Sequence, residues 1–477
     1  MGIFKNAFGI SIAFLAVIAI SGCTMAPKYT KPASPVPAKW PTGAAYTYFE
    51  KNAADESTPL ASALSWREVI TDPRLKEIIE TAMKNNRDLR VAVLNVEKAR
   101  AFYGIGRASL LPSVNAAGSW YKEHVPADLS TTGSAMTSER YDVNLGMTSW
   151  EIDFFGRIRS LKDKTLEEYL ATDQALRGAR IMLASTVAQA YLALAADKES
   201  LQLVSKTLES QEDTYNLIRK RCNAGISTDL DLRRAQSQVE TARGDVARYT
   251  QQVAQDENTL HLLVGSPIRQ ELLPPDLTSV SAPKDISPGI SSEVLLRRPD
   301  VLAAEHRLKA ANADIGAARA TFFPRISLTA AAGTASAELS GLFKSESGAW
   351  SFAPQIVMPI FDARTWFAYD ATKVEKEISV AQYEKAIQAA FREVADALAE
   401  KGMINQRVAV QQSLVDANAE TYRLSELRYM KGVDSYLPVL DAQRSLRITQ
   451  QVLIMLRFAQ INNLITLYKT LGGGEDK

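Results

Sequence analysis

Two similar stretches of sequence constrain what this chain can fold into. Residues Asp300–Ala332 read DVLAAEHRLKAANADIGAARATFFPRISLTAAA, and a related stretch, Asp88–Val114, lies 212 positions earlier. The residues that coincide at this spacing are Asp88/Asp300, Ala92/Ala304, Ala99/Ala311, Ala101/Ala313, Gly104/Gly316, Arg107/Arg319, Ala108/Ala320 and Pro112/Pro324. The chain therefore contains an internal duplication.

Each copy predicts a helix that leads directly into a strand. Ala and Leu favour helix, whereas Pro112 and Pro324 cannot lie inside one, so each helix should end before its proline. From Arg325 to Ala332 an apolar or small side chain recurs at every second position, which is the period of a strand. We therefore expect an α+β fold with an internal two-fold sequence repeat.

The length and charge of the chain are consistent with one folded protein made of two similar halves. The chain has 477 residues, a formal net charge of +1 and 46% hydrophobic residues. We expect the first repeat at 63–265, a Pro- and Ser-rich linker at 266–290, the second repeat at 291–472 and a tail at 473–477. Near-neutral charge without a basic, aromatic-interleaved cluster gives no indication of nucleic-acid binding.

The N-terminus predicts export and lipid attachment. Lys5 precedes an apolar run, Ala7–Ile20, so residues 1–22 read as a signal peptide. The segment Ile20–Cys23 resembles a bacterial lipobox, with isoleucine in place of the usual leucine, which would make 23–62 a tether acylated (palmitate) at Cys23. The alternative is an ordinary secretory signal with an incidental cysteine. Cys222 then has no intramolecular partner, so no disulfide is expected.

Four segments alternate as strands do, at about 113–124, 141–153, 325–334 and 349–361. Strands of roughly ten residues, apolar on one face and small or polar on the other, are typical of transmembrane barrels, although a β-sandwich alternates in the same way. No stretch after the signal has the ~20 consecutive apolar residues of a membrane-spanning helix. Because even the smallest barrels need about eight strands, a barrel must be shared between chains.

Two long segments, Gly156–Cys222 and Ala363–Met430, contain no proline and read as coiled coil. At 1.5 Å per residue each could span roughly 100 Å. Each ends near a glycine, Gly225 or Gly432, after which a return helix is expected. The residues around these two glycines match at a spacing of 207 positions.

The sequence contains no catalytic constellation. Its three histidines, His124, His261 and His306, have no metal-ligand spacing from one another. It also has no Gly-rich phosphate loop and no nucleophile elbow. We therefore expect a protein that is not an enzyme and that needs no cofactor or metal.

Taken together, these features resemble the TolC-type outer-membrane channels, in particular the lipoprotein branch that serves tripartite RND multidrug efflux pumps. The stretches that carry the resemblance are NNRDLRVAVLNVE, WEIDFFGRIRSL, EEYLAT, LLRRPDVLAAEH, GAARATFFPRISLTA, AQYEKAIQAAF and VLDAQRSL. The resemblance implies a homotrimer with a twelve-stranded transmembrane β-barrel, four strands per chain, continuous with a long α-helical coiled-coil periplasmic tunnel. It also implies contact with outer-membrane lipid, a periplasmic membrane-fusion adaptor and an inner-membrane RND transporter.

The family's gate motif places a leucine and an aspartate four residues apart, which Leu437 and Asp441 match. An exposed carboxylate on a coil is the plainer interpretation of Asp441. Arg234 and Arg444 are possible gate-level partners by the 207-residue register. The helix-tip residues that match the family's adaptor-contacting turns are Gly225, Ile226, Gly432 and Val433.

The expected function is a lipid-anchored exit channel in the bacterial outer membrane that extends into the periplasm. It would passively conduct drugs or other small toxic compounds and would be gated at its periplasmic helix tips. Two alternatives stay open: a channel for protein or metal-ion export, and a non-conducting trimeric lipoprotein that bridges envelope layers.

Overall fold

The computed structural model describes residues 24–46, 64–287, 289 and 291–474. Cys23 and residues 47–62 of the expected tether lie outside the described residues. The chain divides into two compact units, which are described separately. Unit 1 comprises residues 1–33, 95–173 and 303–383, and unit 2 comprises 34–94, 174–302 and 384–477.

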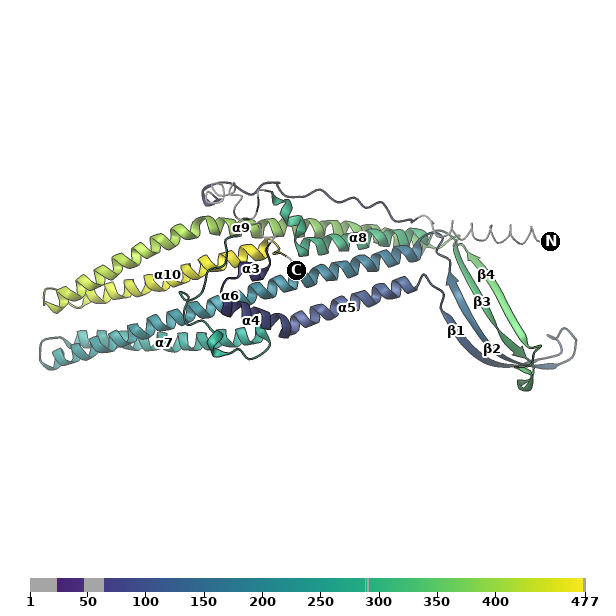
Figure 1. The fold of residues 1–477 in the computed structure, drawn as a ribbon, viewed down its shortest axis with the longest axis horizontal. Coiled ribbons are helices and arrows are strands. Elements are labelled where there is room, and N and C mark those ends of the chain that lie inside the picture. The colour runs from purple at the N-terminus through teal and green to yellow at the C-terminus, as the bar shows by residue number, and fades with distance from the viewer. Residues whose placement is uncertain (1–23, 47–63, 288, 290, 475–477) are drawn as a thin grey trace. The chain divides into compact units, whose positions relative to one another are not determined.

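Unit 1 contains a four-stranded antiparallel sheet in the order β1-β2-β3-β4 (Figure 1). The strands are β1 (Val114–Val125), β2 (Met136–Glu151), β3 (Arg325–Ser336) and β4 (Gly348–Val357). One hairpin comes from each half of the chain, and β2 pairs with β3 to join them. The register shifts between Met147 and Trp150, where Ser149 has a positive φ of 53°.

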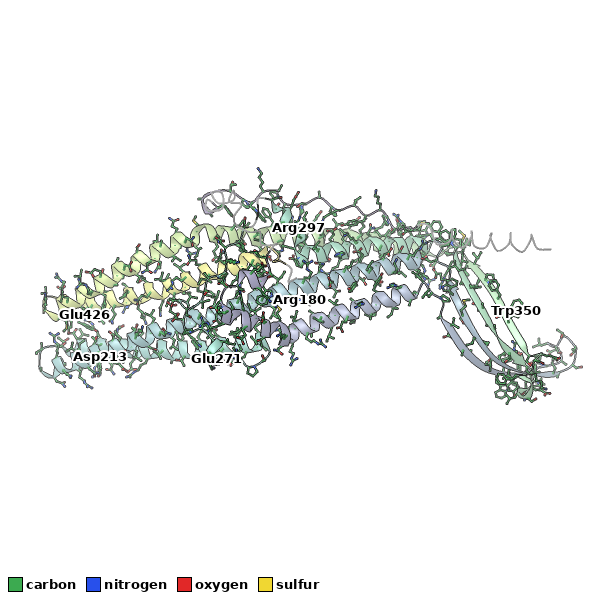
Figure 2. The ribbon with its side chains drawn as sticks, viewed as in Figure 1. Arg180, Asp213, Glu271, Arg297, Trp350 and Glu426 are labelled. Carbon is green, nitrogen blue, oxygen red and sulfur yellow. The ribbon has the colours of Figure 1, made fainter. Side chains whose placement is uncertain are left out.

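The sheet has one apolar face and one small or polar face. Directly paired residues share a face, so the row Val114, Met147, Ala330 and Phe352 defines the apolar one. Its large side chains, each more than 60% exposed, are Val114, Trp120, Leu145, Trp350, Phe352 and Ile356 (Trp350 is labelled in Figure 2). The opposite face carries Asn115, Ser119, Asn144, Ala331, Ser351 and Gln355. The sheet is therefore amphipathic, and its apolar side is uncovered within this chain.

Two strand boundaries differ from the sequence-based expectation. β2 begins at Met136 because polar residues continue the ladder with β1: Lys122 pairs with Glu139, and His124 contacts Thr137 at 2.9 Å. Backbone pairing does not require apolar side chains, so alternation alone places this start too late. β4 ends at Val357, two residues before a proline that cannot donate to the ladder.

Both helix–strand junctions form as the repeat predicts. α5 (Arg87–Ala108) ends four residues before Pro112, and α8 (Pro299–Ala320) ends four residues before Pro324. The Trp150 indole N–H donates to the Leu110 carbonyl at 3.3 Å and ties the first junction to β2. Phe322 packs edge-on against Trp366, with ring centroids 4.9 Å apart, and ties the second junction to the start of α9.

Unit 2 is built mainly from two antiparallel helical hairpins. α6 (Arg157–Asn223) returns as α7 (Asp229–Val264), and α9 (Ala363–Met430) returns as α10 (Leu437–Thr470). Cross-helix contacts include Arg243–Glu212 in the first hairpin and Gln411 donating to the Thr449 carbonyl in the second. The remaining elements are α3 (Trp66–Val69), α4 (Pro73–Asn85) and the short 3₁₀ turns Ala44–Tyr46, Gln270–Leu272, Ser292–Arg297 and, in unit 1, Leu339–Gly341.

One described helix, α6, contains an 18-residue window whose mean hydropathy of 1.3 is high enough for a membrane span. In the structure 56% of that window is buried inside the protein. The buried residues include Val187, Tyr191 and Leu194, each 0% exposed. The apolar character of α6 is thus explained by core packing in unit 2.

The two faces of β4 should respond differently to charge. If the apolar face contacts lipid, Ile356→Arg at the bilayer midplane should lower the free energy of unfolding by about 2–4 kcal/mol. Gln355→Arg, on the opposite face of the same strand, should mainly alter conductance. Denaturant-induced unfolding of the purified protein in lipid bilayers measures both. Equal destabilisation at the two positions would instead indicate a sheet packed on both sides.

Candidate functional site: the helix tips

The two hairpin tips have the same backbone design. Gly225 and Gly432 have φ angles of 74° and 72°, in the left-handed region that glycine adopts without strain. In each turn the residue after the glycine donates its N–H back to an arginine carbonyl: Ile226 to Arg221 at 2.8 Å and Val433 to Arg428 at 3.0 Å. Each glycine N–H also donates to the carbonyl three residues earlier. Together these two hydrogen bonds form a Schellman motif at each tip.

The tips present apolar side chains to their surroundings. Ile226 is 67% exposed and Val433 is 61% exposed. A Cβ added at Gly225 or Gly432 would meet nothing within 4 Å, so space does not require either glycine. The glycines serve the turn, and the residues beside them are free to contact a partner.

A groove of about 680 Å³ lies between α6 and α9 close to the tips. Asp213 and Glu426, labelled in Figure 2, belong to opposite walls of it. The apolar residues that line it are Leu217, Leu427 and Met430. The groove therefore continues the exposed apolar surface of the tips between charged rims.

Leu437 and Asp441 both lie at the start of α10. Leu437 is the first residue of the helix and is 45% exposed, and Pro438 follows in the first turn. Asp441 is exposed one turn further on, and its carbonyl accepts the Ser445 hydroxyl at 2.9 Å. Residues four apart lie on the same side of a helix, so both side chains are available at one level.

The two arginines singled out from the sequence have different surroundings. Arg234 lies on α7 and has a long, 3.9 Å contact with Asp231 of its own helix. Arg444 is exposed on α10 and forms no ion pair with the described residues. Neither contacts Asp441 within one chain, so their role as gate partners across protomers stays a prediction.

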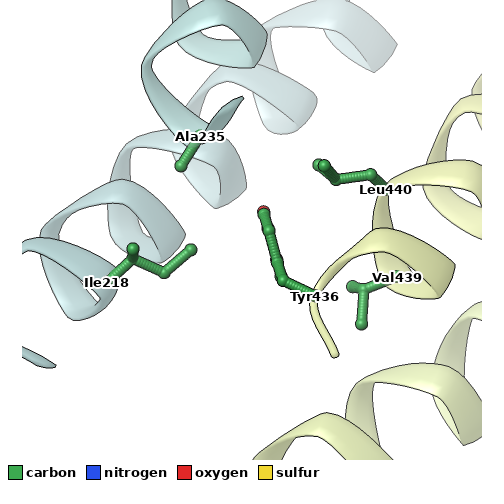
Figure 3. Close-up of a cluster of buried hydrophobic side chains, with 5 residues drawn as sticks. All are labelled: Ile218, Ala235, Tyr436, Val439 and Leu440. Atoms are coloured by element: carbon green, nitrogen blue, oxygen red, sulfur yellow. The ribbon is translucent and has the colours of Figure 1, made fainter. Parts of the chain in front are cut away.

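An apolar cluster lies directly behind the candidate gate and was not predicted from the sequence. Tyr436, 1% exposed, projects from the start of α10 toward Ile218 of α6 and Ala235 of α7 (Figure 3). Val439 and Leu440 complete the cluster, so α10 presents one apolar side inward and the Leu437/Asp441 side outward. The large aromatic residue immediately before Leu437 could have indicated this cluster from the sequence.

Charged contacts reinforce the tip and the seam between the hairpins. Arg428 bridges the second tip by binding Asp434, and this hydrogen bond holds the pKa of the Asp434 carboxyl below its usual range. Further along the helices, Arg447 of α10 pairs with Asp245 of α7. The second pair links the two hairpins, so the start of α10 is supported from behind by apolar contacts and the length of α10 by an ionic one.

An acidic pair lies within the first hairpin. Burial, together with a hydrogen bond to Asp256, raises the pKa of Asp197 to about 7. Asp256 also accepts a hydrogen bond from Gln252 at 3.1 Å, and Arg248 is the nearby positive charge that opposes the shift. Burial beside a second carboxyl therefore favours the protonated form of Asp197. The described residues contain no group of three or more His, Cys, Asp or Glu side chains suited to a metal ion.

Most of the chain, including these tips, matches one known protein family. The family described as "Outer membrane efflux protein" matches residues 78–266 and 290–473. The chain is an outer membrane efflux protein. The family is non-enzymatic, in agreement with the absence of a catalytic constellation, and the two matched segments confirm the internal duplication.

Relatives match this efflux protein over nearly its whole length. The toluene efflux pump outer membrane protein TtgF of Pseudomonas putida is 47% identical over 460 residues, covering 96% of this chain and 95% of TtgF. Outer membrane protein OprJ of Pseudomonas aeruginosa is 42% identical over 477 residues, covering 99% and 97% of the two chains.

Solved structures show the same fold. A membrane protein from Pseudomonas aeruginosa is 41% identical with a TM-score of 0.88, covering 95% of this chain and 98% of that one. The open state of the MtrE outer membrane channel of Neisseria gonorrhoeae is 37% identical with a TM-score of 0.84, covering 94% and 98%. The efflux protein therefore has the TolC-like fold, with long helices and four antiparallel strands per chain.

The buried Tyr436 ring should be a main contributor to stability at the tips. Tyr436→Ala should lower the free energy of unfolding by about 3–5 kcal/mol, because it leaves a cavity between three helices. Tyr436→Phe is the matched control: the hydroxyl has no partner among the described residues, so its removal should leave stability unchanged or raise it. Denaturant unfolding followed by circular dichroism compares the two. Equal losses would mean that the hydroxyl, not the ring, is the important group.

The acidic pair should make stability depend on pH. Because the folded pKa of Asp197 lies above the ordinary aspartate value of about 3.9, the folded state holds the proton more tightly. Stability should fall as pH rises from about 4 to about 7 and then level off. Asp197→Asn should remove that part of the slope, so the variant gains on the parent between pH 5 and 8. Asp416→Asn, which changes an exposed aspartate on α9, should leave that slope in place. An identical slope in all three proteins would contradict the raised pKa of Asp197.

Proposed function

We propose that this outer membrane efflux protein is the trimeric exit conduit of a tripartite pump. The single observation that carries the proposal is the amphipathic sheet with two open edges. Within the described chain β1 pairs only with β2, and β4 pairs only with β3. The outer backbone groups of β1 and β4 need partners in lipid, where water cannot satisfy them.

Three copies supply those partners. Joining β4 of one protomer to β1 of the next gives a closed, even-numbered barrel of twelve strands, four from each chain. The apolar face then contacts lipid, and the face with Asn144 and Gln355 lines the lumen. Closure also covers exposed apolar side chains on the helices beside the barrel, including Phe102 and Ile105 of α5 and Phe367 of α9.

The names of relatives support a proposal for the pump partners and the cargo. TtgF is described as belonging to a toluene efflux pump, and ArpC, 44% identical over 467 residues, to an antibiotic efflux pump. We propose small apolar toxic compounds as cargo, an inner-membrane RND transporter as the energy source and a periplasmic membrane-fusion adaptor as the link. The adaptor would contact Ile226, Val433 and the neighbouring groove, because these offer exposed apolar surface at the tips.

The proposed gate is the ring of Leu437 and Asp441 side chains contributed by three protomers. Three leucines narrow the aperture, and three carboxylates at one level attract cations and repel anions. Mutual repulsion of the carboxylates also opposes closure, so closure needs other contacts. Arg234 and Arg444 of neighbouring protomers are our candidates for those contacts.

The proposed membrane attachment has two parts. The barrel crosses the outer membrane, and acyl chains (palmitate) on Cys23 add a second anchor. Two signals give firm attachment where a single acyl chain gives only marginal binding. Because the barrel is sufficient by itself, the anchor must have a purpose other than simple retention.

Planar-bilayer recordings test the gate. Asp441→Ala should weaken the cation preference of the resting pore because it removes the ring of negative charge. Leu437→Ala should raise the resting conductance because it widens the aperture. Neither change should alter trimer stability, since both side chains are exposed.

Asp416→Ala is the control for the charge change, since it removes an exposed aspartate from α9 rather than from the proposed ring. It should reproduce the parent's selectivity. If both gate variants also reproduce the parent's conductance and selectivity, the constriction lies elsewhere. If the parent itself forms no channel at all, the conduit proposal fails.

A further inference from the structure

The places in unit 1 where helices meet the sheet carry an excess of positive charge (Figure 1). We define these junctions as residues 105–113, 151–160, 317–326 and 357–366, which include the last turns of α5 and α8 and the first turns of α6 and α9. They contain six arginines and no lysine, against three carboxylates, so their formal net charge is +3 in each chain. The arginines are Arg107, Arg157, Arg159, Arg319, Arg325 and Arg364.

Four of these arginines share the three carboxylates. Two others, Arg107 and Arg319, form no ion pair with any carboxylate of the described residues. Both lie in the last turn of a helix that precedes a strand, at equivalent positions 212 residues apart. Their charge is therefore not compensated within the chain. The four ion pairs have N···O distances of 2.7 to 3.2 Å and are Arg157–Glu151, Arg325–Glu151, Arg159–Asp153 and Arg364–Asp362.

Arg319 is oriented by its neighbours, and its charged end is left available. Its Nε–H donates to the hydroxyl of Tyr369 on α9 at 3.0 Å, and its guanidinium carbon lies 5.6 Å from the centroid of the Tyr369 ring. Its two terminal nitrogens have no hydrogen-bond partner among the described residues. A guanidinium held through Nε keeps the terminal N–H groups with which arginine binds phosphate. The side chain is thus arranged to accept an anion.

Aromatic rings surround this arginine and continue to the surface. Phe322, in the turn after α8, packs edge-on against Tyr369 with ring centroids 5.8 Å apart, and the same ring contacts Trp366. Trp366 is 63% exposed. An exposed tryptophan beside a basic side chain is typical of the headgroup layer of a membrane, where one end of the indole is apolar and the other is hydrated. We call Arg319, Phe322, Trp366 and Tyr369 the junction cluster.

The first repeat retains the unpaired arginine, although its neighbours have diverged. Arg107 is exposed, and its guanidinium carbon lies 5.8 Å from the centroid of the Tyr103 ring. Tyr103 in turn stacks on Tyr169 of α6, with centroids 6.4 Å apart. At the position of Phe322 the first repeat has Leu110. An arginine that rests on a tyrosine and has no carboxylate partner therefore occurs at both helix–strand junctions.

The neighbouring sheet indicates which anion these arginines meet. Arg319 is six residues before the start of β3, so its Cα lies within about 20 Å of the sheet. In the proposed barrel the apolar face of the sheet contacts hydrocarbon, and a headgroup layer about 5–7 Å thick follows on each side. Arginine side chains bridge such a boundary by keeping the stem against apolar groups and the charge in the headgroup layer. The anionic group of a phospholipid in that layer is its phosphodiester.

We propose that Arg107 and the junction cluster bind the phosphodiester headgroups of anionic phospholipids in the leaflet beside the helices. Arg319 donates its terminal N–H groups to the phosphate, and Trp366 contacts the adjoining apolar part of the lipid. A free phosphate ion would use the guanidinium but would leave the exposed indole uncovered. Three chains would place six such arginines around the barrel. This inference rests on the proposed transmembrane barrel and adds a preference for one class of lipid.

Titration of phosphatidylglycerol into the purified full-length protein in a neutral detergent, followed by native mass spectrometry, tests the site. The double variant Arg107→Gln/Arg319→Gln should bind this lipid about tenfold more weakly, or worse, because two charges near the anionic headgroup are lost. Arg392→Gln is the matched charge control, since it removes an exposed arginine of α9 in unit 2, and it should bind as the parent does. Arg107→Lys/Arg319→Lys keeps both charges and should lose less affinity than the glutamine variant.

Four results would overturn the proposal. They are equal affinities of the parent and the glutamine variant, equal losses in the lysine and glutamine variants, equal binding of phosphatidylglycerol and zwitterionic phosphatidylcholine by the parent, and displacement of bound phosphatidylglycerol by an equal concentration of inorganic phosphate. The second would assign the loss to damage at the junction, and the last would indicate a site for any small anion. Planar-bilayer conductance of the parent is recorded separately. A conducting parent that shows any of these results leaves the conduit proposal intact, whereas a parent that forms no channel contradicts the conduit proposal itself.

Discussion

The need for every backbone N–H and C=O to find a partner in lipid governs this protein. β1 and β4 each have one neighbouring strand, so the sheet of one chain ends in two unsatisfied edges. The apolar side chains on the uncovered face of the sheet likewise lack a partner within one chain. In the trimer that we propose, a single chain is one segment of the channel, and assembly completes both the hydrogen bonding of the edges and the burial of the apolar face. The helices that flank the sheet leave apolar residues uncovered for the same reason.

The helix tips combine a packed apolar interior with an exposed surface. Tyr436 packs against both hairpins, and the Arg447–Asp245 pair links α10 to α7. The opposite side of α10 leaves Leu437 and Asp441 exposed. An exposed leucine and carboxylate on a rigid support can narrow a pore and select ions without any chemistry.

The duplicated scaffold carries unequal functions. Gly225 and Gly432 form turns with the same hydrogen bonds, because both repeats must reverse a long helix. In the 207-residue register, however, Tyr436 corresponds to Asp229, so the first tip has no tyrosine at the position of the buried Tyr436 ring. Shared backbone requirements preserved the symmetry, while side-chain contacts with unique segments diverged.

The duplication, the helix–strand junctions, the four strands and the two helical hairpins could all be predicted from local sequence patterns. These features depend on local rules: proline ends a helix, side chains alternate in a strand, and glycine adopts a left-handed turn. The sequence did not show that the mainly polar segment Met136–Arg140 continues a strand, that Tyr436 is buried while Leu437 is exposed, or that Glu305 and Asn312 contact Lys31 and Pro27. Each of these depends on a partner distant in the sequence, and no local pattern encodes which residue will lie opposite.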